Sequence, residues 1–173
     1  MKLILCLLTL CILLAGCSTQ SNTSQTPASA SPIEAKKITS TGVVSATVNP
    51  VAISPGASVQ SMVALKIQSG YHVNANPPTF PYLKATQLDI TAGDGISASS
   101  VAYPTAVTKK FAFAEKPLAV YEGETEIKAT IKADTTASKG QHSVAAQLRV
   151  QACDDQVCYP PGQIELHIPV TVK

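Results

Sequence analysis

Tryptophan is absent from this 173-residue sequence, methionine occurs twice, and aromatic residues make up only 5% of it. Charged residues account for 14%, the net charge is +2, and the largest basic clusters are two pairs of lysines, Lys36-Lys37 and Lys109-Lys110. Proteins that bind nucleic acid carry a concentrated basic patch, so the sequence predicts no nucleic-acid partner. The shortage of methionine also argues against a copper carrier, because Cu(I) favours thioether ligands.

The motifs of several large enzyme classes are absent as well. There is no Gly-x-Ser-x-Gly, no phosphate-binding glycine loop and no His-Glu-x-x-His. These patterns position a nucleophile, cradle a phosphate or bind zinc. A hydrolase or a nucleotide-dependent enzyme therefore has no support in the sequence.

The one long apolar run lies at the N-terminus. Residues 3–15 (LILCLLTLCILLA) follow Lys2, are too few to span a bilayer comfortably, and lead into small residues, as in a secretion signal. The sequence LAGC at 14–17 resembles the lipobox of bacterial lipoproteins, which are cleaved before the cysteine and lipidated on it. We expect residues 1–16 to be a lipoprotein signal peptide and Cys17 to be the lipid anchor, with an ordinary secretion signal as the alternative.

The segment after Cys17 is poor in large apolar side chains. Residues 17–40 consist mostly of Ser, Thr, Gln, Pro and Ala, which cannot bury enough surface to offset their ordering entropy. We predict a flexible tether whose ends lie roughly 25 Å apart on average. Residues 41–173 would then form one exported domain, held by lipid at a bacterial membrane and facing the periplasm or the cell exterior.

Beyond the tether, apolar residues recur at every second position. This period is typical of half-buried β-strands, and no window shows a helical stripe with start and stop signals. The strongest alternation lies in residues 59–68, 126–133, 143–151 and 163–172, with shorter candidates at 42–48, 86–91 and 100–104. Seven or more short strands separated by turn-rich pieces predict an all-β, immunoglobulin-like antiparallel β-sandwich.

The only cysteines in the predicted domain are Cys153 and Cys158, in QACDDQVCYPPG (151–162). Export places them in an oxidising space, and a hairpin-like closure would bring their Cα atoms within the roughly 4.4–6.8 Å that a disulfide needs. Closing so short a loop stabilises a fold by only about 2 kcal/mol. The spacing leaves three uses open: a structural bridge, a redox pair or part of a metal site.

A metal site is the weakest of the three, because zinc takes three or four protein ligands and this pair supplies two. His72, His142 and His167 are scattered in the sequence, and we expect each to be a solvated or hydrogen-bonded surface residue. Asp154 and Asp155 adjoin Cys153, and nearby negative charge raises a thiol pKa. The pair is therefore not expected to be a strong oxidant, although the two carboxylates could simply form a solvated loop tip.

Three segments resemble the N-terminal periplasmic domain of the thiol:disulfide interchange reductase DsbD. They are VQACDDQVCYPPG at 150–162, SGYHVNANPPTFPYLKATQLDI at 69–90 and KKFAFAEKPLAVYEGETEIKATI at 109–131, and the resemblance covers roughly residues 45 to 172. It implies an immunoglobulin-like fold and a cysteine pair that shuttles electrons, with no cofactor other than the disulfide. It also implies exported partners of the thioredoxin-like or disulfide-isomerase-like kind.

The resemblance assigns roles to individual residues. Cys158 would form the mixed disulfide with a partner, and Cys153 would resolve it. Phe111 matches the aromatic residue of a cap over the disulfide, with Phe113 as a near rival, and both could instead face a core. The residues expected to line the site are Tyr71, Tyr121, Tyr159 and Pro160.

Two departures from the family pattern stand out. Four residues separate the cysteines here, where the best-known members have five. The full-length reductase continues into a membrane domain and a thioredoxin-like domain, whereas this sequence stops at Lys173, so we expect a separate electron source. The chief alternatives are a lipoprotein binding module with a structural disulfide, and a metal-delivery module that uses the cysteines with a histidine.

Overall fold

The computed structural model describes residues 37–173. The predicted signal peptide, the predicted lipid anchor Cys17 and nearly all of the predicted tether lie outside these residues. Between 37 and 173, no helix is long and apolar enough to cross a membrane. The single helical element in this range is a 3-10 turn, η1 (Ser40–Gly42), and everything that follows is strand or loop.

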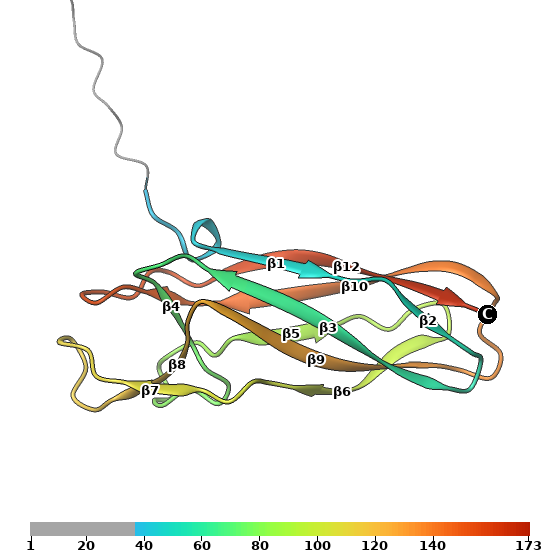
Figure 1. Cartoon of the computed structure of the whole chain (residues 1–173), viewed down its shortest axis with the longest axis horizontal. Helices are drawn as coiled ribbons and strands as arrows, with labels where there is room; N and C mark the ends of the chain where they lie inside the picture. Colours follow the sequence, from blue (N-terminus) through green and yellow to red (C-terminus); the bar gives the residue numbers. More distant parts are fainter. Residues whose placement is uncertain (1–36) are drawn as a thin grey trace, which may run out of the picture. The chain divides into compact units, whose positions relative to one another are not determined.

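Two four-stranded sheets form the body of the domain (Figure 1). The first has the order β1-β3-β9-β6 and is antiparallel throughout. The second has the order β2-β12-β10-β5, in which only β2 runs parallel to its neighbour β12. The strands of the first sheet are β1 (Val44–Val48), β3 (Ser58–Ile67), β9 (Glu124–Ala133) and β6 (Ile96–Ala102), and those of the second are β2 (Val51–Ile53), β12 (Gly162–Val172), β10 (Gly140–Val150) and β5 (Gln87–Ile90).

The main core lies between the two sheets. The four segments with the strongest predicted alternation are the four longest strands, and in each one the predicted apolar face is the buried face. The fully buried side chains of this core include Val63, Leu65, Ile127, Ile131, Leu148 and Ile168. The prediction of an all-β, immunoglobulin-like β-sandwich is therefore confirmed, apart from the single parallel pairing of β2.

A third, smaller sheet lies at one end of the sandwich (Figure 1). It has the order β11-β4-β8-β7, with β11 (Ala152–Cys153), β4 (His72–Asn74), β8 (Leu118–Tyr121) and β7 (Val107–Lys109). In the sequence, β4 comes directly after β3 and β8 directly before β9, and both β3 and β9 belong to the first sheet. β11 comes directly after β10 of the second sheet. The third sheet thus joins the ends of both main sheets, and it carries one of the two cysteines.

Candidate functional site

Cys153 and Cys158 form a disulfide across a tight hairpin. Cys153 ends β11, and Cys158 pairs with it as an isolated antiparallel bridge. The flanking hydrogen bonds run from the Asp154 amide to the Val157 carbonyl and from the Tyr159 amide to the Ala152 carbonyl, at 2.9 and 2.8 Å. The cysteines therefore occupy a non-hydrogen-bonded pair, the position where opposite side chains lie closest. Their Cα atoms are 3.9 Å apart, slightly closer than the range expected from the sequence.

The two sulfur-bearing residues differ in exposure. Cys153 is completely buried at 0% exposure, whereas Cys158 is half-buried. Cys158 is therefore the cysteine of the pair that has surface open to solvent. The pair thus consists of one reachable cysteine, Cys158, and one enclosed cysteine, Cys153.

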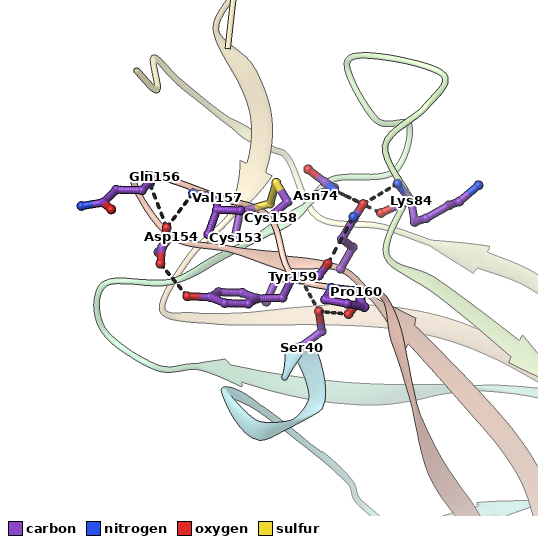
Figure 2. Close-up of a disulfide and its surroundings, with 12 residues drawn as sticks. Ser40, Asn74, Lys84, Cys153, Asp154, Gln156, Val157, Cys158, Tyr159 and Pro160 are labelled. Atoms are coloured by element: carbon purple, nitrogen blue, oxygen red, sulfur yellow. Dashed lines mark hydrogen bonds between the residues drawn. A yellow bond between two sulfur atoms is a disulfide. The ribbon is translucent and has the colours of Figure 1, made fainter. Parts of the chain in front are cut away.

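Asp154 organises the hairpin loop (Figure 2). One carboxylate oxygen accepts hydrogen bonds from the amides of Gln156 and Val157, both at 2.8 Å, and the other accepts from the Tyr159 hydroxyl at 2.6 Å. These bonds lower the pKa of Asp154, the Tyr159 bond most, and the same bond raises the pKa of Tyr159 to about 12. Asp154 is thus a structural part of the loop, while Asp155 is exposed at the loop tip.

Two side chains from outside the loop hold the base of the hairpin (Figure 2). The buried hydroxyl of Ser40 donates to the carbonyl of Pro160 at 2.6 Å and accepts from the amide of Ala152 at 3.0 Å. The side chain of Gln151 accepts from Asn74 and from the Lys84 amide and donates to the Tyr159 carbonyl. Neither Ser40 nor Gln151 was predicted as a site residue, and neither belongs to a motif that would identify it.

His72 corrects one expectation from the sequence. It is 1% exposed, and it lies directly opposite Cys153 in the pairing of β4 with β11. Its Nε2 atom has no hydrogen-bond partner among residues 37–173. The prediction that it is a solvated or hydrogen-bonded surface residue is wrong. Burial lowers its pKa, with Glu122 acting in the opposite direction. The other two histidines agree with the expectation. His142 is hydrogen-bonded through Nε2 to the Ser138 carbonyl oxygen at 2.7 Å, and His167 is exposed.

The two phenylalanines of the predicted cap have different environments. Phe111 is 2% exposed and stacks on His72 with the ring centroids 4.0 Å apart. It belongs to a small core, separate from the main one, together with Leu83, Ala114, Leu118 and Val120. Phe113 is 40% exposed and stacks on Phe111 at 5.4 Å. Phe111 therefore covers the imidazole opposite Cys153, and Phe113 forms the outer layer.

A groove of about 320 Å³ opens beside the disulfide. Cys158 lines it, together with Phe113 and Ala114 of the loop between β7 and β8, which spans residues 110–117 and which we call the cap loop. Three of its lining side chains are large, apolar and exposed: Tyr82 at 70%, Val157 at 50% and Phe113. The reachable cysteine thus lies in an apolar groove, and the phenylalanine that shares this groove is Phe113. Tyr82 was not predicted from the sequence.

The remaining predicted residues lie around this site at different depths. Tyr71 packs against Tyr159 with the ring centroids 6.1 Å apart. Tyr121 is buried, and its hydroxyl accepts a hydrogen bond from the Asn76 amide at 3.0 Å. Burial also raises the pKa of Tyr121. Pro160 is exposed, and its carbonyl is the acceptor for Ser40.

No group of three or more His, Cys, Asp or Glu side chains between residues 37 and 173 is arranged to hold a metal ion. The disulfide is the reactive group that the structure shows at this site. Thiol–disulfide exchange requires an accessible disulfide sulfur, a leaving thiol and a route for the proton. Of the two cysteines, Cys158 is the one with exposed surface and Cys153 is the enclosed one.

The chain is similar to known thiol:disulfide interchange proteins. The family model described as the N-terminal part of the thiol:disulfide interchange protein DsbD matches residues 43–168, which include the third sheet and the cysteine hairpin. No curated protein matches the chain.

Similar solved structures include two N-terminal domains. The N-terminal domain of DsbD from Neisseria meningitidis in the reduced form is 19% identical, with a TM-score of 0.46, and the match covers 68% of this chain and 82% of that one. The N-terminal periplasmic domain of ScsB from Proteus mirabilis is 17% identical, with a TM-score of 0.49, and the match covers 72% of this chain and 44% of that one.

Proposed function

Because this chain belongs to the family of the N-terminal domain of the thiol:disulfide interchange protein DsbD, we propose that it exchanges its Cys153–Cys158 disulfide with a partner thiol protein outside the cytoplasm. Electrons pass to or from that partner through the cysteine pair, without a further cofactor. The partner is an exported protein of the thioredoxin-like or disulfide-isomerase-like kind. Lipid on Cys17 holds the protein at a bacterial membrane.

The unequal exposure of the two cysteines is the observation that carries this proposal. A partner thiolate attacks the sulfur of half-buried Cys158, because Cys153 is enclosed. The bond between the two cysteines breaks, and Cys153 leaves with the electron pair as a thiolate. In the opposite direction, Cys153 attacks Cys158 and releases the partner. The buried cysteine is suited to resolution because only an attached partner presents it with a disulfide.

The groove beside Cys158 supports docking of a partner protein. Its exposed side chains, Tyr82, Phe113 and Val157, form an apolar surface around the reachable sulfur. Aromatic side chains are enriched where proteins make contact. Since Phe113 is on the cap loop, a docking partner displaces or packs on this loop before the sulfurs meet.

A structural disulfide in a lipoprotein binding module is the alternative. The hydrogen bonds of Ser40, Gln151 and Asp154 make the hairpin well ordered, as a structural element would be. However, the bond closes a loop of only about six residues and so adds roughly 2 kcal/mol by the chain-entropy model. A bond retained only for stability also has no need of an apolar groove beside one sulfur.

The reduction potential of the pair tests the proposal. The sample is the full chain in detergent with Cys6, Cys11 and Cys17 changed to serine, which we call the two-thiol chain. It is equilibrated in thiol redox buffers, and its oxidation state is read by alkylation and mass. We expect a potential between about −180 and −270 mV, the range of known exchange proteins, whereas a value well below about −300 mV would identify a structural bond.

A further inference from the structure

In the part of the chain that the structure describes, one buried nitrogen beside the disulfide lacks a hydrogen-bond partner. His72 is 1% exposed, and its Nε2 atom accepts and donates no hydrogen bond within residues 37–173. Nearly all buried polar atoms in native proteins are paired, so an exception requires an explanation. Phe111 stacks on the imidazole at 4.0 Å and separates this face of the ring from solvent. The oxidised protein therefore encloses a base that it does not use.

The strand register places the His72 side chain beside that of Cys153. The two residues are directly opposite each other in the antiparallel pair of β4 and β11. Such residues project to the same face of a sheet, with Cβ atoms about 4.5–5.5 Å apart. In the disulfide, the sulfur of Cys153 carries no proton. Reduction adds a proton to this sulfur. The resulting thiol is the hydrogen-bond donor that the imidazole lacks in the oxidised protein.

We propose that the imidazole of His72 accepts the thiol proton of Cys153 and so activates Cys153 as the resolving sulfur. This inference rests on the proposed function in one respect, namely that the disulfide is opened and re-formed by exchange. It assigns the unpaired nitrogen a role in the reduced protein, the state in which Cys153 acts as a nucleophile. A thiolate is the nucleophile in exchange, so a base beside the thiol increases the rate of attack.

The proton and electron pair can be followed through the resolving step. In the mixed disulfide, Cys158 is bonded to the partner sulfur and Cys153 is a thiol. Cys153 transfers its proton to Nε2 of His72, and the electron pair left on its sulfur attacks Cys158. The bond between Cys153 and Cys158 forms, the bond from Cys158 to the partner breaks, and the partner sulfur leaves as a thiolate. The imidazolium then gives its proton to that thiolate, directly or through water.

The charges around His72 fit both stages of this transfer. Burial lowers the pKa of His72, which favours the neutral ring that can accept a proton. The carboxylates of Glu122, Asp155 and Asp154 raise the pKa and so favour the imidazolium, whereas Lys109 lowers it. Lys109 is paired with Glu122 at 2.7 Å, so these two charges offset each other. The charges that still favour the imidazolium are those of the two aspartates of the hairpin loop, Asp154 and Asp155.

The rate of resolution tests the role of His72. The reduced two-thiol chain is mixed with excess dithiobis-nitrobenzoate, an aromatic disulfide whose thiolate product is coloured. Attack by Cys158 releases the first coloured thiolate, and attack by Cys153 on the resulting mixed disulfide releases the second. His72→Phe keeps an aromatic ring against Phe111 and removes both nitrogens. His167→Phe makes the same change at an exposed position and is the matched control.

We expect His72→Phe to slow the second release at least about tenfold near neutral pH, with the first release unchanged. The difference should shrink as the pH rises past the ordinary thiol pKa of about 8.5, where Cys153 ionises without a base. His167→Phe should behave as the parent chain does. Equal second-phase rates and equal pH profiles in the parent chain and His72→Phe would overturn the inference.

Two further measurements keep the inference testable if His72→Phe does not fold. His72→Gln retains a hydrogen-bonding side chain but cannot take up the proton, so it should show the same slow second phase. In the unmodified site, reduction should move the NMR resonance of the His72 Nε2 nitrogen and leave that of His167 in place. An unchanged His72 resonance would count against the inference.

The resolution assay and the potential measurement separate the two proposals. A slow second phase in His72→Phe together with a potential typical of structural disulfides would refute the exchange function and leave the proton transfer standing. A potential in the exchange range together with an unaffected second phase would support the exchange function and refute the proton transfer to His72.

Discussion

The hydroxyl of Ser40 accepts a hydrogen bond from the amide of Ala152 at 3.0 Å, across 112 positions of the sequence. The same hydroxyl donates to the carbonyl of Pro160 at 2.6 Å (Figure 2). Ala152 precedes the first cysteine of the hairpin and Pro160 follows the second, so one side chain joins both sides of the hairpin. The point where the chain enters the domain is thereby attached to the disulfide site.

Replacing Ser40 with alanine should destabilise the oxidised protein by about 1–3 kcal/mol, because a buried amide and a carbonyl lose their partner. Urea unfolding of the oxidised two-thiol chain measures this loss. We also expect dithiothreitol to reduce the disulfide faster in this variant, since the hairpin opens more easily. Ser143→Ala removes an exposed hydroxyl from β10 and should change stability by no more than about 0.5 kcal/mol. Equal stability of the two variants would show that Ser40 does not hold the hairpin.

The two thiols of the reduced two-thiol chain should react at different rates. Cys158 is half-buried and Cys153 is completely buried, so iodoacetamide should modify Cys158 at least about tenfold faster. Mass spectrometry of the peptides, sampled over time, measures both rates. Cys153→Ser should then trap a stable mixed disulfide with a partner through Cys158, whereas Cys158→Ser should trap little. Faster modification of Cys153 would reverse the assigned roles.

The long strands were predictable because one of their faces is buried and the other is solvated. In β3, β9, β10 and β12 this difference produces an alternation that is directly visible in the sequence. The strands of the third sheet give no such signal. All three residues of β4 are buried, and β11 has only two residues. The part of the fold that positions the site was therefore the part that periodicity could not identify.

The candidate site was predictable only in part, for a similar reason. The cysteines and the phenylalanines stand out by residue type and by resemblance to a family. His72 acts through its position in β4, Ser40 through its position in η1, and Gln151 through its position between β10 and β11. A His, Ser or Gln at one position has no pattern of its own. In particular, a histidine's burial depends on which strand lies beside it and which ring lies above it. Those neighbours, Cys153 and Phe111, are 81 and 39 positions away from His72 in the numbering of the chain.

Alanine substitutions should separate the two phenylalanines near the cap loop. Phe111→Ala removes a buried ring from the small core and should cost about 3–5 kcal/mol in urea unfolding. Phe113→Ala should cost under about 1 kcal/mol, because this side chain is 40% exposed. It should, however, increase the rate of disulfide reduction by dithiothreitol by about two- to tenfold, because Phe113 shares the groove with Cys158. An unchanged reduction rate would show that Phe113 does not restrict access.

Asp154→Asn should destabilise the oxidised protein at neutral pH by roughly 1 kcal/mol. The asparagine side chain keeps the shape of the aspartate but makes weaker hydrogen bonds with the Gln156 and Val157 amides and with Tyr159. The expected loss is small because solvent already screens much of the carboxylate charge. Asp155→Asn is the matched control, because it removes a charge from the exposed neighbour. Urea unfolding at several pH values measures both variants, and an equal loss in both would assign the effect to net charge alone.

The pH dependence of this difference follows from the lowered pKa of Asp154. A carboxyl whose pKa is lower in the folded state than its ordinary value of 3.8 stabilises the fold above that value. The stabilisation is lost as the pH falls through the lowered pKa, so Asp154→Asn and the parent chain should converge in acid. At the alkaline end, the hydrogen bond to Asp154 raises the pKa of Tyr159 to about 12, and Asp154→Asn should return it toward 10.0. Ultraviolet titration of the tyrosines measures this shift, and a Tyr159 pKa that stays near 12 in Asp154→Asn would show that another group is responsible.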